Sequence, residues 1–239
     1  LRDLVAEKLH VVTVDTDQEE VARVMAKYNL PAIPVVDDHN RLLGRVTFDD
    51  IMDVMETEST EDLLKIVGVS EDESLRGSWL DAVKSRLPWL LINVITASTA
   101  GLVVSLFSGT LEKLVVLASY MPVIAGVAGN GATQALAVTI RRLATEGIPV
   151  KRYFSVIFKE ISVGLINGVV IGGIVSLVAI YTQANPMLGL VVFLAMVGNL
   201  FIAGMAGSAV PLLLQRINID PAVASSILIT AFTDILGYS

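Results

Sequence analysis

Long uncharged stretches occupy most of the chain after its first third. Residues 87–111 and 114–140 contain no charged residue, and the same is true from 161 to 215. A helix needs about 20 apolar residues to cross the hydrocarbon core of a bilayer, so each stretch can span it, and the polar segment 181–186 divides the longest one in two. Another apolar stretch begins near Pro221. The pattern predicts an α-helical polytopic membrane protein with spans at about 87–108, 114–142, 157–181, 187–214 and 222–239, the last incomplete.

The N-terminal part has a different pattern, in which short β-branched runs are separated by turn residues. The predicted strands are 11–14, 32–36 and 42–47. Thr16 followed by Glu19 is a capping-box pattern that predicts a helix, and a second helix begins at Phe48. The predicted parts are an α/β module at 1–55, an acidic linking helix and connector at 56–86, and a transmembrane pore domain at 87–239. Because the chain starts at Leu1 and its fifth span is short, we expect a piece of a longer protein.

Composition and charge support this division. The chain is 54% hydrophobic, with a mean hydropathy of +0.69, which is far from an ordinary soluble domain. The net charge of −7 is uneven, because residues 1–86 hold 19 acidic against 10 basic residues. Such an acidic domain argues against nucleic acid as a partner and permits cation binding. The absence of cysteine excludes disulfides and thiolate metal sites from this chain.

Lysine and arginine predict the orientation in the membrane. Basic residues precede the first predicted span, occur between the second and third, and follow the fourth, whereas the opposite connections hold only Lys113. The positive-inside rule therefore places the N-terminal module in the cytoplasm. The segment 147–159 mixes basic and aromatic residues, so we expect a short helix lying on the cytoplasmic surface.

The helix that begins at Phe48 has an acidic face. The acids on this face are Asp50, Asp53, Glu58, Glu61 and Asp62, which fall within about half of the helix circumference. No basic residue is interleaved before Lys65, although like charges on neighbouring turns destabilise a helix. One interpretation is a solvated acidic linker. The other is that divalent cations bridge this face to a second acidic surface.

Two features place polar chemistry at membrane depth. Asp234 lies inside an apolar run, where an unpaired carboxylate costs several kcal/mol. This residue therefore indicates an ion pathway. The alternative is a short amphipathic helix of a soluble protein, with Asp234 facing water. Residues 122–134 contain glycines, two amides and a threonine, which predicts a helix lining water. By contrast, Gly164, Gly168 and Gly172 have the four-residue spacing of close helix packing.

The N-terminal module resembles a CBS domain, and residues 34–37 and 43–50 carry the likeness. In that family a threonine and the aspartate three residues later can hold a nucleotide's phosphate and ribose. The resemblance therefore implies that Thr47 and Asp50 bind ATP or another adenosine ligand. The alternative is that Thr47 only ends a strand.

The whole arrangement resembles the MgtE family of magnesium channels and transporters. The likeness rests on the CBS module, the acidic helix, five spans, the motif from Pro122 to Gln134, and Asp220-Pro221-Ala222 followed by Asp234. It implies a homodimer whose second and fifth spans form a pore around one hydrated Mg²⁺. The implied pore residues are Asp234, Asn130, Gly126, Thr230 and Ser226. The implied regulatory Mg²⁺ ligands are Asp17, Glu19, Asp50, Asp53, Glu58, Glu61, Asp62 and Asp220.

The expected function is therefore Mg²⁺-gated, Mg²⁺-selective uptake across the plasma membrane, without enzymatic chemistry. Oxygen ligands and a retained water shell suit Mg²⁺. Two alternatives remain at this point. One is an exchanger for Co²⁺, Mn²⁺ or Mg²⁺ in which Asp234 alternates between substrate and H⁺ or Na⁺. The other is a membrane-anchored nucleotide sensor that transports nothing.

Overall fold

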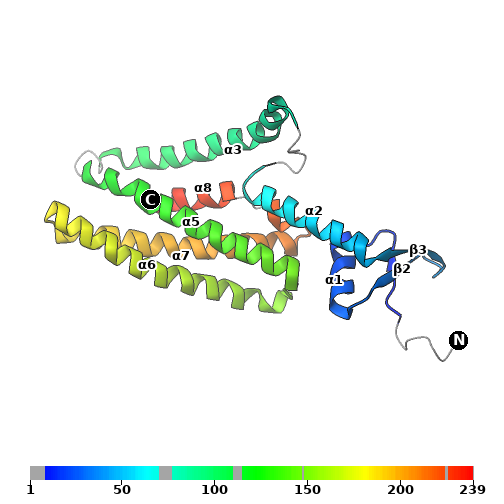
Figure 1. The fold of residues 1–239 in the computed structure, drawn as a ribbon. Helices are drawn as coiled ribbons and strands as arrows, with labels where there is room; N and C mark the ends of the chain where they lie inside the picture. The colour runs from blue at the N-terminus through cyan, green and yellow to red at the C-terminus, as the bar shows by residue number, and fades with distance from the viewer. Residues whose placement is uncertain (1–8, 70–76, 110–114, 147, 224–225, 239) are drawn as a thin grey trace. The chain divides into compact units, whose positions relative to one another are not determined.

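The computed structural model describes residues 9–69, 77–109, 115–146, 148–223 and 226–238. They form two compact units, residues 1–63 and 64–239, with the helix Phe48–Ile66 running from the first into the second. The first unit is α/β and the second is helical (Figure 1). The fold class predicted from the sequence is thus confirmed.

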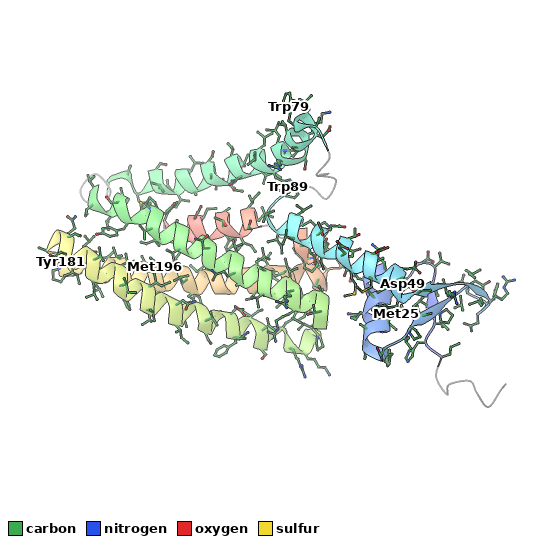
Figure 2. All side chains as sticks on the ribbon, viewed as in Figure 1. Met25, Asp49, Trp79, Trp89, Tyr181 and Met196 are labelled. Atoms are coloured by element: carbon green, nitrogen blue, oxygen red, sulfur yellow. The ribbon has the colours of Figure 1, made fainter. Side chains whose placement is uncertain are left out.

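The first unit is a three-stranded sheet with helices α1 (Gln18–Tyr28) and α2 (Phe48–Ile66). Strand β2 (Ala32–Val36) is central, parallel to β1 (Val12–Thr13) and antiparallel to β3 (Leu42–Thr47). Its core contains Val12, Val21, Met25, Ile33 and Ile51, and Met25 lies within it in Figure 2. The order β-α-β-β-α is the predicted one.

Helix α1 is capped one residue later than predicted, and helix α2 continues beyond the predicted end of the module. The cap of α1 is Asp17, whose side chain accepts the Glu19 backbone N–H. The predicted cap at Thr16 is therefore wrong by one residue, because the Thr16 hydroxyl instead accepts the Thr13 backbone N–H, 3.0 Å away. Helix α2 then continues well beyond residue 55 as one element, so the acidic face belongs to the helix that closes the module.

In its described residues, the second unit contains five α-helices that lie wholly within it. They are α3 (Trp79–Leu106), α5 (Val115–Glu146), α6 (Tyr153–Gln183), α7 (Pro186–Arg216) and α8 (Ser226–Gly237), with 3-10 turns η2 (Val150–Arg152) and η3 (Pro221–Val223). In the described part of the chain, four helices are long and apolar enough to cross a membrane, and α8 is a shorter apolar helix.

Within the described residues 148–159, the predicted surface helix does not form a separate element. Residues 150–152 form η2, and Tyr153 already begins α6, which continues unbroken to Gln183. The aromatic residues Phe154 and Phe158 are exposed on its first turns. A span that begins this early keeps its backbone hydrogen bonds continuous through the basic segment, which costs less than breaking the helix.

Glycines set how closely the helices of the second unit pack. A methyl group on Gly164 or Gly204 would overlap backbone atoms of Leu200 or Glu160, respectively, across the contact between α6 and α7. Met196, fully buried on α7, lies among the packed helices (Figure 2). The prediction that this glycine spacing serves helix packing is confirmed. Helix α8 packs against α5, α7 and α3.

Candidate functional site: a polar pathway between α5 and α8 and an acidic cluster on α2

Helix α5 presents two faces of opposite character. Ala125, Ala128 and Ala132 are buried, whereas Gly126 and Asn130 are exposed and lie four residues apart, on the same face of the helix. Gln134 continues this exposed line. We call Gly126, Asn130 and Gln134 the polar stripe of α5. Within the described residues no atom lies within 4 Å of a methyl built on Gly126, so the stripe borders open space in one chain.

Helix α8 carries a second polar line that lies next to α5. Ser226, Thr230 and Asp234 follow one another at four-residue spacing and are all partly buried. A methyl built on Gly129 would come within 3.2 Å of the Thr230 Cγ2 atom, so the two backbones approach closely at this level. The predicted pore residues are thus carried by two helices in direct contact.

Only one carboxylate lies on these two lines. Among the described residues, no group of three or more histidine, aspartate or glutamate side chains is gathered closely enough to hold a metal ion. The described part of one chain therefore does not form a dehydrated cation site from several carboxylates. Asp234 with neighbouring hydroxyl and carbonyl oxygens suits a cation that keeps its water shell, as Mg²⁺ tends to do.

The first unit gathers three other acids around Glu19. Partial burial of its carboxyl group, followed by the charges of Glu58, Asp62 and Asp17, raises the pKa of Glu19 to about 7, although the residue as a whole is exposed. Gln18 donates a hydrogen bond to the Glu58 carboxylate. We call Asp17, Glu19, Glu58 and Asp62 the acidic cluster. It joins the first turn of α1 to the acidic face of α2.

The other predicted regulatory acids have different surroundings. Asp53 is exposed on α2, and Glu61 is partly buried on the same helix. Asp220 accepts a hydrogen bond from Lys65 and another from the Ala222 backbone N–H. Four of the eight predicted ligands therefore interact through their charges, but no three described acids lie closely enough to hold a metal ion.

Thr47 and Asp50 are close partners at the start of α2. The backbone N–H and the hydroxyl of Thr47 both donate to Asp50 Oδ2, at 2.9 and 2.6 Å. These two hydrogen bonds hold the pKa of Asp50 below its usual range. The arrangement caps the helix, and a nucleotide ribose or phosphate would have to compete with it.

Sequence analysis missed three polar residues of the second unit. Lys65 was noted only as the end of the acidic run. Glu160 is 7% exposed on α6, and Asn199 is 2% exposed on α7 beside Gly237. The Asn199 amide has no hydrogen-bond partner among the described residues. An amide inside an otherwise apolar span was the available signal for Asn199, since such groups are costly in lipid.

Comparison with known proteins identifies relatives of both parts of the chain. The family model for MgtE, described as a divalent cation transporter, matches residues 121–239, and the CBS domain model matches residues 1–57. The magnesium transporter MgtE of Bacillus subtilis is 38% identical over 229 residues, which cover 95% of this chain and 51% of that protein.

Two further relatives give the same result. The magnesium transporter MgtE of Thermus thermophilus is 36% identical over 236 residues, covering 96% of this chain and 51% of the relative. The magnesium transporter MgtE of Enterococcus faecalis is 35% identical over 235 residues, which cover 98% of this chain and 52% of that protein. The chain thus spans about half the length of the relatives that it matches. With a CBS domain followed by the transporter region, it belongs to the MgtE family.

Proposed function

We propose that this chain forms the pore and part of the regulatory apparatus of a Mg²⁺ channel that mediates magnesium uptake across the plasma membrane. The observation that carries the proposal is the contact between Gly129 and Thr230. It holds the polar stripe of α5 beside the polar line of α8, which ends in the intramembrane carboxylate of Asp234. The three relatives are named magnesium transporters, which supports Mg²⁺ as the transported ion.

The chemistry required of the pore is modest, because no bond is made or broken. Asp234 supplies negative charge that offsets the cost of bringing a divalent cation into the membrane. Thr230 and Ser226 on α8, with Asn130 and the Gly126 backbone on α5, can hydrogen-bond to the ion's water molecules. Retaining that shell favours Mg²⁺, which dehydrates reluctantly. Selectivity would then depend on the size of the hydrated ion.

The pore is proposed to be completed by a second copy of the chain. In one copy, Asn130 and Gln134 are exposed on a helix long enough to span the bilayer. Lipid-facing amides at membrane depth are unfavourable, whereas amides lining a water-filled pathway are tolerated. A symmetric homodimer would cover both stripes and place two Asp234 carboxylates on one axis.

Gating is proposed to act through the acidic face of α2. Ionised carboxylates of the acidic cluster repel one another at short range. Mg²⁺ bound among them would remove that repulsion and favour a compact, closed state. Because Mg²⁺ would bind the closed state more tightly than the open state, a higher Mg²⁺ concentration would increase the closed population. The proposed ligands are Asp17, Glu19, Asp50, Asp53, Glu58, Glu61 and Asp62. Asp220, which the family resemblance implied as an eighth, is paired with Lys65. The N-terminal module would lie in the cytoplasm, where it senses Mg²⁺ and, through Thr47 and Asp50, ATP.

The proposal is tested by replacing the pore carboxylate in the full-length protein. Asp234→Asn should abolish Mg²⁺ flux into proteoliposomes while the dimer still forms, and it should fail to rescue a cell that lacks Mg²⁺ uptake. Asp38→Asn, an exposed aspartate of the first unit, is the matched control and should behave as wild type. Wild-type flux in Asp234→Asn would refute the pore assignment. Flux that requires a proton or sodium gradient would favour an exchanger instead.

A further inference from the structure

The last turn of α2 is joined to the segment before α8 by an ion pair. Lys65 Nζ lies 2.8 Å from Asp220 Oδ2, although the two residues are 155 positions apart. The two side chains are 23% and 41% exposed, so the pair is partly shielded from solvent. Shielding strengthens the attraction relative to a fully exposed pair.

Asp220 also fixes the start of the turn that leads into α8. Its second oxygen, Oδ1, accepts the backbone N–H of Ala222 at 2.9 Å, within η3. Ala222 is itself fully buried. Both oxygens of this carboxylate thus have donors from the protein, one from α2 and one from η3. In this arrangement Asp220 links two elements directly.

A second contact, made by Gly68, reinforces the ion pair. Gly68 ends α2 in the left-handed region (φ +72°). The backbone N–H groups of Gly68 and Val69 donate to the carbonyls of Lys65 and Leu64, which is the Schellman pattern. A methyl built on Gly68 would come within 2.6 Å of Ile227 Cδ1 on α8. The end of α2 therefore packs directly on the first turn of the helix that carries Asp234.

We propose that Lys65 is a positioning residue: through Asp220 it fastens the last turn of α2 to α8, so that the two move as one body. This inference rests on the proposed Mg²⁺ channel and adds its mechanical link. Helix α2 is continuous from its acidic face to Lys65, so a change in how that face is held is transmitted along its backbone to α8. Lys65 is then a tether, and Mg²⁺ is not its competitor for Asp220.

The proposal is tested by measuring how cytoplasmic-side Mg²⁺ inhibits flux in the full-length protein. Lys65→Met removes the tether, so the Mg²⁺ concentration for half-inhibition should rise by about five-fold or more, a typical coupling between sites, while maximal flux stays near wild type. Lys65→Arg should keep the wild-type value. The exchange of Lys65→Asp with Asp220→Lys should restore part of the loss. Lys84→Met, at an exposed lysine of α3, is the matched control.

A cross-linking measurement tests the same idea without flux. The chain has no cysteine, so Val67→Cys with Ile219→Cys, at exposed positions that flank the pair, can be joined by a short bifunctional thiol reagent while Lys65 and Asp220 stay in place. The yield should be equal at low and high Mg²⁺, and far above that of Lys84→Cys with Ile219→Cys.

Three results would overturn the tether. They are unchanged half-inhibition in Lys65→Met, a shift of that variant toward lower Mg²⁺, and a cross-linking yield that falls as Mg²⁺ rises. The last two would mean that Mg²⁺ displaces Lys65 from Asp220. Absence of Mg²⁺ flux in the wild type would instead refute the proposed function, and the cross-linking would still report on the tether.

Discussion

Thr230 of α8 lies against Gly129 of α5, so closely that a methyl group at position 129 would come within 3.2 Å of the Thr230 Cγ2 atom. Any larger side chain at 129 must push α8 away from α5. Because Thr230 is one helical turn from Asp234, this contact also fixes the position of the carboxylate relative to the polar stripe of α5. Gly129 is therefore a packing residue on which the pathway depends.

Gly129→Val should separate α8 from α5 and lower both stability and flux. Overpacking of this kind costs about 1–3 kcal/mol, and the apparent melting midpoint of the detergent-solubilised protein measures it. Gly126→Ala is the stability control, since the described structure leaves room for a methyl there. Its melting midpoint should match or exceed that of the wild type. Equal melting midpoints for Gly129→Val and Gly126→Ala would contradict the close contact.

Replacement of two glycines of α6 by alanine should change the stability of the protein in different ways. A methyl on Gly164 would overlap the backbone carbonyl of Leu200, which cannot rotate away, whereas one on Gly173 meets no described atom within 4 Å. We expect Gly164→Ala to cost about 3 kcal/mol or more. Gly173→Ala should be neutral or stabilising by up to about 1 kcal/mol, because alanine is the better helix former. Their melting midpoints, compared in the same detergent, check both expectations.

The sequence was sufficient for the fold because its signals are local. Uncharged stretches mark the long helices, and the strand–helix order of the first unit follows from β-branched runs and turn residues. Boundaries were less accurate. The start of α6 at Tyr153 was missed because basic and aromatic residues resemble an interfacial helix, although hydrogen-bond continuity favours one long helix.

The candidate site was only partly accessible from the sequence. The polar stripe of α5 and the polar line of α8 follow from four-residue spacing. The contact between Thr230 and Gly129 depends on tertiary packing, which the spacing does not reveal. The pair formed by Lys65 and Asp220 joins positions 155 residues apart, and no spacing rule predicts such a contact. The likeness to MgtE suggested Asp220 as a metal ligand, whereas in this conformation its oxygens accept protein donors.

Nucleotide binding and the cap of α2 should both depend on the Thr47 hydroxyl. Thr47→Ser keeps the hydroxyl that donates to Asp50, so both cap and binding should survive. Thr47→Val removes the hydroxyl, and we expect loss of ATP affinity together with a less stable start of α2. Calorimetry with ATP on the full-length protein measures the first effect, and thermal unfolding the second. Absence of binding heat in the wild type would refute the nucleotide proposal and leave Thr47 as a cap.

The acidic cluster should make the regulatory unit sensitive to pH near neutrality. Since the pKa of Glu19 is raised from 4.5 to about 7, the folded state favours its protonated form. This contribution to stability is complete below about pH 4.5 and is lost as pH rises through about 7. Mg²⁺ favours the ionised cluster, so it should stabilise the unit more at pH 8 than at pH 6. Binding near pH 6 should also release protons.

Glu19→Gln removes the titrating carboxyl group, and it should therefore flatten the change in stability between pH 5 and pH 8 and reduce proton release on Mg²⁺ binding. Glu56→Gln, an exposed acid of α2 outside the cluster, is the control and should keep the wild-type pH profile. Calorimetry in buffers of different ionisation enthalpy counts the protons released, and protease protection of residues 9–63 follows compaction. If Glu19 only lies on a solvated surface, both variants will show the same proton count and the same Mg²⁺-dependent protection. A difference confined to Glu19→Gln would instead tie this carboxyl group to the site where Mg²⁺ acts, because both substitutions make the same chemical change: each replaces one carboxylate by an amide of nearly equal size.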